Sequence, residues 1–166
     1  FEAYKKLNIK NVDYILNLQG DEPAIDENDI INLNNMMIKT NSNIGTMGAE
    51  IKNQNFFSNE NIVKVKTKEK LNDKNFSLAL SFQRNHVLKE KKNIYHHIGV
   101  YAYNIKTLEK FVDLKQTENE IENKLEQLRA IDNNLKINVT LAKSSPIGVD
   151  TKEDYLALKK IMEYKS

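Results

Sequence analysis

The chain contains no cysteine and no long apolar run, and both absences narrow what it can be. The lack of cysteine among 166 residues excludes disulfides, thiolate zinc sites and a cysteine nucleophile, although it leaves the redox compartment open. No apolar stretch approaches the roughly 20 residues that a membrane-spanning helix needs. We therefore expect a soluble protein that has no membrane partner and whose default location is the cytoplasm.

An excess of charge of either sign is also missing. The 25 basic and 23 acidic residues give a formal net charge of +2, so there is no electrostatic reason to expect nucleic acid as a partner. Glycine is scarce while Asn and Lys are abundant, which we attribute to the composition of the source genome. With 40% hydrophobic and 29% charged residues, the composition is typical of a globular protein. We assign residues 1–166 to a single domain.

Hydrophobic periodicity predicts helices alternating with strands. The most regular helix is expected at 118–131, where Ile121, Leu125, Leu128 and Ile131 form one stripe. Asp26 is a candidate N-cap for a helix that runs to about Lys39. Further helices are expected at 1–7, 106–112 and 152–163, and strands at 14–19, 45–51, 62–66, 78–82, 94–103 and 135–142. This order indicates an α/β fold with a mixed, mostly parallel sheet flanked by helices.

The first predicted strand ends abruptly in Gln19, Gly20, Asp21, Glu22 and Pro23. In open α/β sheets, ligands bind beyond the carboxyl ends of the strands. Asp21 follows this strand and Asp150 precedes the last predicted helix, so both fit such an edge and can share one Mg²⁺, which prefers oxygen ligands. The same acids are equally compatible with a turn and a helix cap.

Other polar residues are candidates for ligand contacts. Arg84 ends a strand, and its planar guanidinium suits a carboxylate or a phosphate, although a solvated Arg is the commoner case. His96 and His97 are adjacent on a strand and point to opposite faces, so we expect no shared metal site. Tyr101 lies on the face of His97, where the two can contact a polyhydroxylated ligand or simply pack. Glu126 and Gln127 matter only if their helix end approaches the loop of Asp21.

Five segments together resemble the 3-deoxy-manno-octulosonate (Kdo) cytidylyltransferases in spelling, order and separation. They are NLQGDEP at 17–23, IVKV at 62–65, HIGVYAY at 97–103, LEQLR at 125–129 and GVDT with ED at 148–154. The resemblance spans nearly the whole chain and implies a Rossmann-like, nucleotide-diphospho-sugar transferase architecture. Two positions depart from the family pattern: Gln83 stands before Arg84 where the family has Ser, and Asn104 stands where it commonly has Arg.

The resemblance implies a reaction and a site. The reaction is transfer of CMP from CTP to the 2-hydroxyl of Kdo with release of pyrophosphate, for lipopolysaccharide biosynthesis. Asp21 and Asp150 would be the catalytic carboxylates that hold Mg²⁺. The sugar-acid pocket would comprise Gln19, Gly20, Arg84, His97, Tyr101, Glu126 and Gln127. The family also suggests a homodimer for the full-length form.

Members of this family begin with a strand and a Gly/Arg/Lys-containing loop that grips the CTP triphosphate, and no such segment precedes Phe1. We therefore expect the chain to correspond to the C-terminal two-thirds of such an enzyme, incomplete at its N-terminus, and to be inactive alone. The alternatives are a cytidylyltransferase for a related or modified sugar acid, another sugar nucleotidyltransferase, and a non-catalytic sugar-binding fragment.

Overall fold

The fold was taken from a computed structural model of residues 1–166. The described residues are 1–19, 24–84, 92–143, 152, 155–156 and 159–160. In chain order, the elements are α1 (Glu2–Leu7), β1 (Tyr14–Asn17), α2 (Glu27–Thr40), β2 (Ile44–Ala49), α3 (Asn55–Ser58), β3 (Lys64–Thr67), β4 (Ser77–Gln83), β5 (Ile94–Asn104), α4 (Ile105–Val112), α5 (Glu118–Asn123), α6 (Gln127–Asp132) and β6 (Ile137–Ala142).

The described strands form one mixed sheet in the order β1-β5-β2-β6-β4-β3, and β3 also pairs with the first residues of β5. The α/β class with a mixed sheet is confirmed. The expected majority of parallel neighbours is not found among these strands, because only β2 and β6 pair in parallel. β1 and β2 are both antiparallel to β5, so β1, β2 and β6 run in the same direction and their carboxyl ends reach the same edge of the sheet.

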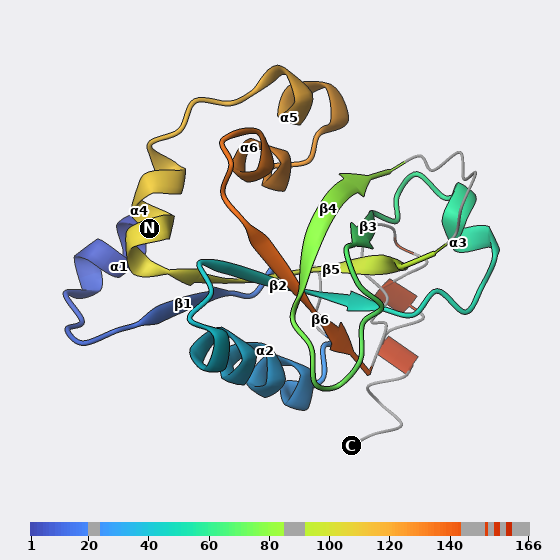
Figure 1. The fold of residues 1–166 in the computed structure, drawn as a ribbon, viewed down its shortest axis with the longest axis horizontal. Coiled ribbons are helices and arrows are strands. Elements are labelled where there is room, and N and C mark those ends of the chain that lie inside the picture. Colours follow the sequence, from blue (N-terminus) through green and yellow to red (C-terminus); the bar gives the residue numbers. More distant parts are fainter. Residues whose placement is uncertain (20–23, 85–91, 144–151, 153–154, 157–158, 161–166) are drawn as a thin grey trace.

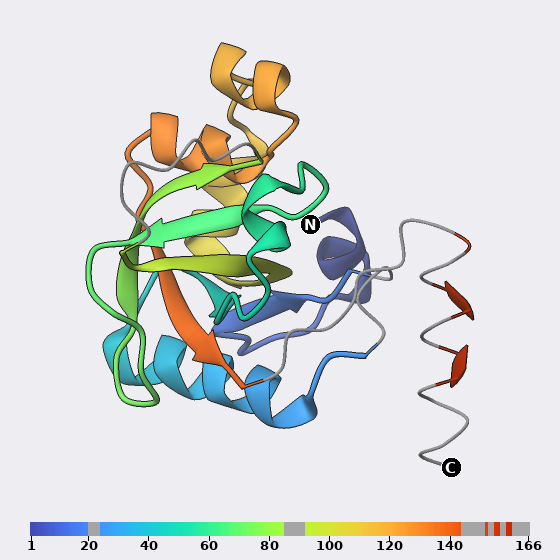
Figure 2. The same cartoon turned by 90° about the vertical axis from the view of Figure 1, so that its right-hand side faces the viewer.

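The sheet is covered on both faces (Figures 1 and 2). α2 lies along one face, where apolar side chains pack from α2, β2 and β5, among them Leu33, Met37, Met47, Ile98 and Val100. The short helices α4, α5 and α6 cover the other face, where the core includes Phe82, Tyr101, Tyr103, Phe111, Leu125 and Leu128. β5 is buried along nearly its whole length because both layers pack on it. Its His and Tyr side chains are therefore buried, although they are polar.

α2 begins as the sequence predicts. The side chain of Asp26 accepts a hydrogen bond from the main-chain nitrogen of Asn28, which satisfies one of the free N–H groups of the first turn. Its buried apolar face is narrow. Leu33, Met36 and Met37 are buried, whereas Ile31 and Ile38 are more than half exposed because they point away from the sheet.

The single helix predicted at 118–131 is wrong, because the chain forms two short helices there. Lys124 adopts left-handed backbone angles (φ 52°, ψ 46°) and ends α5, and α6 begins three residues later. The break lets Leu125 and Leu128 pack into the core while Ile121 stays 58% exposed. A stripe of apolar residues at helical spacing therefore does not guarantee a continuous helix.

The remaining predictions differ mainly at the ends of elements. β1 stops at Asn17 and β6 starts at Ile137, each two residues inside the predicted bounds. β3 and β4 pair with each other, whereas β2 pairs with β5 and β6. Most of the helix predicted at 152–163 lies outside the described residues, so the single-domain assignment stays a prediction. Within the described part, no helix is long and apolar enough to cross a membrane.

Candidate functional site

His97 lies on the sheet face that carries Phe82 and Tyr101, the face that α4, α5 and α6 cover. Its ring is buried, its Nε2 atom is 3.0 Å from the hydroxyl oxygen of Thr46, and its centroid is 5.0 Å from that of Phe82. Burial, helped by the neighbouring His96, lowers the pKa of His97 to about 3. The ring is therefore neutral at physiological pH. His96 packs against Phe56, on α3, so the two histidines do point to opposite faces.

Tyr101 lies beside His97, as the sequence predicts. The two ring centroids are 5.4 Å apart, and Tyr101 stacks on Tyr103 at 5.8 Å. The Tyr101 hydroxyl is buried and has no hydrogen-bond partner among the described residues. Burial raises the pKa of this phenol, so it keeps its proton. A buried hydroxyl without a partner costs free energy, about 1–3 kcal/mol, unless something else binds it.

The start of α6 carries Glu126 and Gln127. Glu126 is exposed, lies 3.5 Å from Arg129, and raises the pKa values of Tyr101 and Tyr103 through its negative charge, although less than burial does. The Glu126 carboxylate is thus close enough to Tyr101 and Tyr103 to act on them electrostatically. Gln127 follows it as the first residue of α6. The condition set by the sequence, that this helix end approach the loop of Asp21, stays a prediction because Asp21 lies outside the described residues.

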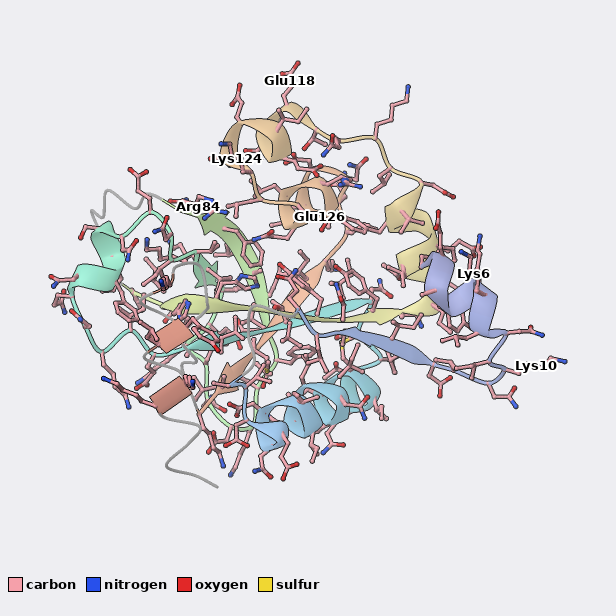
Figure 3. The ribbon with its side chains drawn as sticks, turned by 180° about the vertical axis from the view of Figure 1, so that it is seen from behind. Lys6, Lys10, Arg84, Glu118, Lys124 and Glu126 are labelled. Carbon is pink, nitrogen blue, oxygen red and sulfur yellow. The ribbon has the colours of Figure 1, made fainter. Side chains whose placement is uncertain are left out.

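Arg84 follows the last residue of β4 and faces the connection between α5 and α6 (Figure 3). Its guanidinium donates to the main-chain oxygens of Glu60 and Lys124, each at 3.3 Å. These residues border a cavity of about 660 Å³ that Phe82 also lines, so the cavity adjoins the aromatic ring that packs on His97. The remaining lining is mainly polar and includes Ser81, Gln83, Asn119, Glu122 and Asn123.

The metal carboxylates predicted by the sequence cannot be placed, since Gly20, Asp21 and Asp150 lie outside the described residues. The strands before them can be placed. Asn17, the last residue of β1, is the partner of Tyr101, and Gln19 is exposed just beyond it. β6 runs parallel to β2 and ends at the same edge. Among the described residues, no three His, Asp or Glu side chains gather as a metal site.

Sequence reasoning missed two groups that support the site. Thr46 contacts His97 from β2, and nothing in the run Gly45-Thr46-Met47 marks it as polar support for another strand. Glu120 is buried and binds Arg129 through two hydrogen bonds of 2.6 and 2.7 Å, which join α5 to α6. The spacing of Glu120 and Arg129 does not fit one continuous helix face, so only the break at Lys124 brings them together.

Comparisons with known proteins agree on one relationship. The profile of the cytidylyltransferase family matches residues 1–137. The 3-deoxy-manno-octulosonate cytidylyltransferase of Bartonella bacilliformis is 41% identical over 148 residues, which cover 89% of this chain and 60% of that protein. The enzyme of the same name from Thermodesulfovibrio yellowstonii is 40% identical over 92% of this chain and 64% of its own. The chain thus spans about 60% of the length of these curated relatives.

Solved structures give the same picture. CMP:2-keto-3-deoxy-manno-octonic acid synthetase complexed with CTP superposes with a TM-score of 0.84 and 26% identity, over 99% of this chain and 66% of that one. A 4-diphosphocytidyl-2C-methyl-D-erythritol synthase from Anaerococcus prevotii, at 14% identity and a TM-score of 0.53, shares the fold. These matches confirm the resemblance that the five sequence segments carry.

Proposed function

Because this chain belongs to the cytidylyltransferase family, we propose that it provides the sugar-acid site of an enzyme that transfers CMP from CTP to the 2-hydroxyl of Kdo. Pyrophosphate leaves as the new phosphoester bond forms. Relatives named as Kdo cytidylyltransferases and a similar synthetase complexed with CTP support this substrate pair. The chain spans about 60% of those relatives, so the proposal concerns the activity of the whole enzyme to which this site contributes.

One observation carries the proposal: a neutral imidazole and an unpartnered phenol lie side by side on β5. The rings of His97 and Tyr101 are 5.4 Å apart, and the Tyr101 hydroxyl has no partner among the described residues. A sugar with several hydroxyls offers both donors and acceptors to such a pair. A site built only for packing gains nothing from a buried hydroxyl that lacks a partner.

The remaining predicted residues suit an acid sugar. Arg84 brings a permanent positive charge to the cavity, and its hydrogen bonds to main-chain oxygens are long at 3.3 Å, so a substrate carboxylate can replace them with shorter, charge-assisted ones. Gln127 and Gln19 each offer an amide donor and acceptor for hydroxyl groups. Glu126 accepts hydrogen bonds from hydroxyls near the β5 tyrosines. In this proposal, these groups bind and orient the sugar.

Mg²⁺ is the proposed cofactor, with Asp21 and Asp150 as its ligands. A carboxylate donor set suits Mg²⁺, which takes one or two protein carboxylates together with substrate phosphates. β1 and β6, the strands before these two segments, end at the same edge of the sheet. When bound, the ion would offset negative charge on the transferred phosphate.

Pyrophosphate release from CTP and Kdo tests the reaction in the intact protein, and direct Kdo binding tests the site. Tyr101→Phe should weaken Kdo binding about tenfold, because a neutral hydrogen bond is lost, whereas Tyr155→Phe, at an exposed tyrosine, should leave it unchanged. Kdo binding without pyrophosphate release would favour the sugar-binding alternative. Release with a modified or related sugar acid but not with Kdo would favour the other cytidylyltransferase alternative. A mass measurement tests the proposed homodimer.

A further inference from the structure

The hydroxyl of Thr46 has three polar neighbours. Its oxygen lies 2.8 Å from the carbonyl oxygen of Val100, 3.2 Å from that of Ile98 and 3.0 Å from Nε2 of His97. The Thr46 side chain is fully buried, so water does not supply alternative partners at its surface. The contact occurs where β2 and β5 change register, since Thr46 is the partner of Tyr101 but Met47 is the partner of Ile98.

The chemistry of these neighbours determines the direction of each hydrogen bond. A carbonyl oxygen can only accept, and a hydroxyl has one proton to donate. The Thr46 proton therefore points to the carbonyl oxygens of Val100 and Ile98. The Thr46 oxygen is then the acceptor toward His97, so Nε2 must carry a proton.

We propose that Thr46 is a positioning residue that holds His97 as the Nε2–H tautomer, so that Nδ1 is the hydrogen-bond acceptor of the sugar site. The ring is neutral, because burial keeps its pKa far below physiological pH, and it has one proton, which Thr46 binds. His97 thus recognises a group that donates a hydrogen bond, a sugar hydroxyl, and does not pair with the substrate carboxylate. The role of Nδ1 in substrate binding rests on the proposed function, whereas the tautomer does not.

Tyr101 complements this assignment. Its hydroxyl keeps its proton and lacks a partner among the described residues, so it is able to donate where His97 can only accept. The two side chains together match a hydroxyl-bearing sugar carbon chain, in which each hydroxyl both donates and accepts. The carboxylate of the sugar acid then needs a positively charged partner, and Arg84, which lines the adjoining cavity, can provide it.

Nitrogen chemical shifts of the imidazole rings test the tautomer directly in the intact protein without ligand. The chain has three histidines, and His86→Gln and His96→Gln variants identify the remaining signals as those of His97. We expect a protonated Nε2 and an unprotonated Nδ1 from neutral to mildly acidic pH. A protonated Nδ1, or rapid exchange between the two tautomers, would overturn the proposal whatever the enzyme's substrate proves to be.

A pair of Thr46 variants separates positioning from packing. Thr46→Ser keeps the hydroxyl and should keep the Nε2–H signature and Kdo affinity. Thr46→Val keeps the shape but removes the acceptor, so His97 should exchange between tautomers, and Kdo binding should weaken about tenfold, the effect of one neutral hydrogen bond. An unchanged tautomer in Thr46→Val would overturn the proposal. Absence of Kdo binding in the unmodified protein would count against the proposed function and leave the tautomer result standing.

Discussion

The ammonium group of Lys64 lies 2.6 Å from the main-chain oxygen of Arg84. A second hydrogen bond of 2.5 Å joins it to the main-chain oxygen of Asn59. The Lys64 side chain is buried, and burial lowers its pKa, with the charge of Arg84 acting in the same direction and that of Glu60 opposing it. One buried cation therefore links the start of β3 to the residue that follows β4, Arg84, which is the candidate arginine for substrate binding.

Replacing Lys64 should destabilise the fold and loosen the end of β4. Lys64→Met keeps the length of the side chain but leaves two carbonyl oxygens without their donor, which costs about 1–3 kcal/mol in the free energy of unfolding. Urea denaturation measures this loss. Lys68→Met, at an exposed lysine of the loop after β3, is the matched control and should change the free energy of unfolding by less than about 0.5 kcal/mol. Equal effects of the two variants would show that the buried contacts contribute nothing.

Removal of Arg84 should affect substrate binding more than the fold. Arg84→Ala deletes a guanidinium whose own hydrogen bonds are long, so the melting temperature should change little. The KM for the acid sugar should rise at least tenfold while kcat changes less, because a substrate contact is lost. Arg84→Lys keeps the charge without the planar fork and should recover only part of the affinity. An unchanged KM in Arg84→Ala would remove this residue from the site.

Breaking the ion pair between Glu120 and Arg129 should strongly destabilise the α5–α6 layer. Glu120 accepts two hydrogen bonds from the guanidinium, and its side chain is 5% exposed. Glu120→Gln leaves the partly buried guanidinium without its counter-charge, and breaking such a pair costs about 3 kcal/mol. Glu118→Gln, at an exposed acid in the first turn of the same helix, is the control. Thermal unfolding of the two variants should differ clearly.

Stability should fall as the solution becomes mildly acidic. Burial lowers the pKa of His97 to about 3 and that of His96 to about 4, and Lys64 adds to the effect on His96. In the unfolded chain both bind protons near pH 6.5, so between pH 6.5 and 4 the unfolded state holds more protons and is favoured as pH falls. Each imidazole contributes about 1.4 kcal/mol per pH unit well below 6.5. Glu120 acts in the same direction only at lower pH, because Arg129 holds the pKa of its carboxyl below the usual value.

Urea midpoints at pH 7 and pH 5 measure this dependence. The midpoint should be lower at pH 5, and His96→Gln and His97→Gln should each reduce the difference between the two pH values. A midpoint that does not change between pH 7 and pH 5 would mean that the imidazoles are accessible to protons in the folded state.

Gly45 should not tolerate a side chain. A Cβ atom there would lie 2.5 Å from Sδ of Met37 and 2.7 Å from Cζ of Phe76, where α2 packs on β2. Overpacking of this kind costs about 1–3 kcal/mol, so Gly45→Ala should lower the melting temperature. In a Met37→Ala background the same substitution should cost less, because the missing thioether leaves room. Additive effects of the two substitutions would show that the helix and the strand are farther apart than described.

Local patterns predicted much of the fold. Alternating and helical periodicities located the strands and helices, and Asp26 gave the start of α2, because these signals arise from residues close in sequence. The break at Lys124 could not be predicted. Local spacing favours one helix, and the contact that accompanies the break, between Glu120 and Arg129, joins residues that one continuous helix would keep on different faces.

The candidate site was predictable to the same extent. Strand periodicity correctly placed His97 and Tyr101 on one face. The neighbours that set the properties of His97 come from other strands: Thr46 from β2 and Phe82 from β4. Sheet order decides those contacts, and sheet order is not contained in any one segment. The roles of Asp21 and Asp150 remain predictions.

The long central strand β5 also constrains when the protein can fold. Tyr14 pairs with Asn104, and Ile44 pairs with Tyr103, so β1 and β2 find their shared partner only in a segment made much later. During synthesis, both strands stay without their β5 partner until β5 has emerged. Closing such long loops is entropically costly and slows folding. We expect a nascent chain that ends before Ile94 to expose apolar strand surface and to be a natural substrate for chaperones.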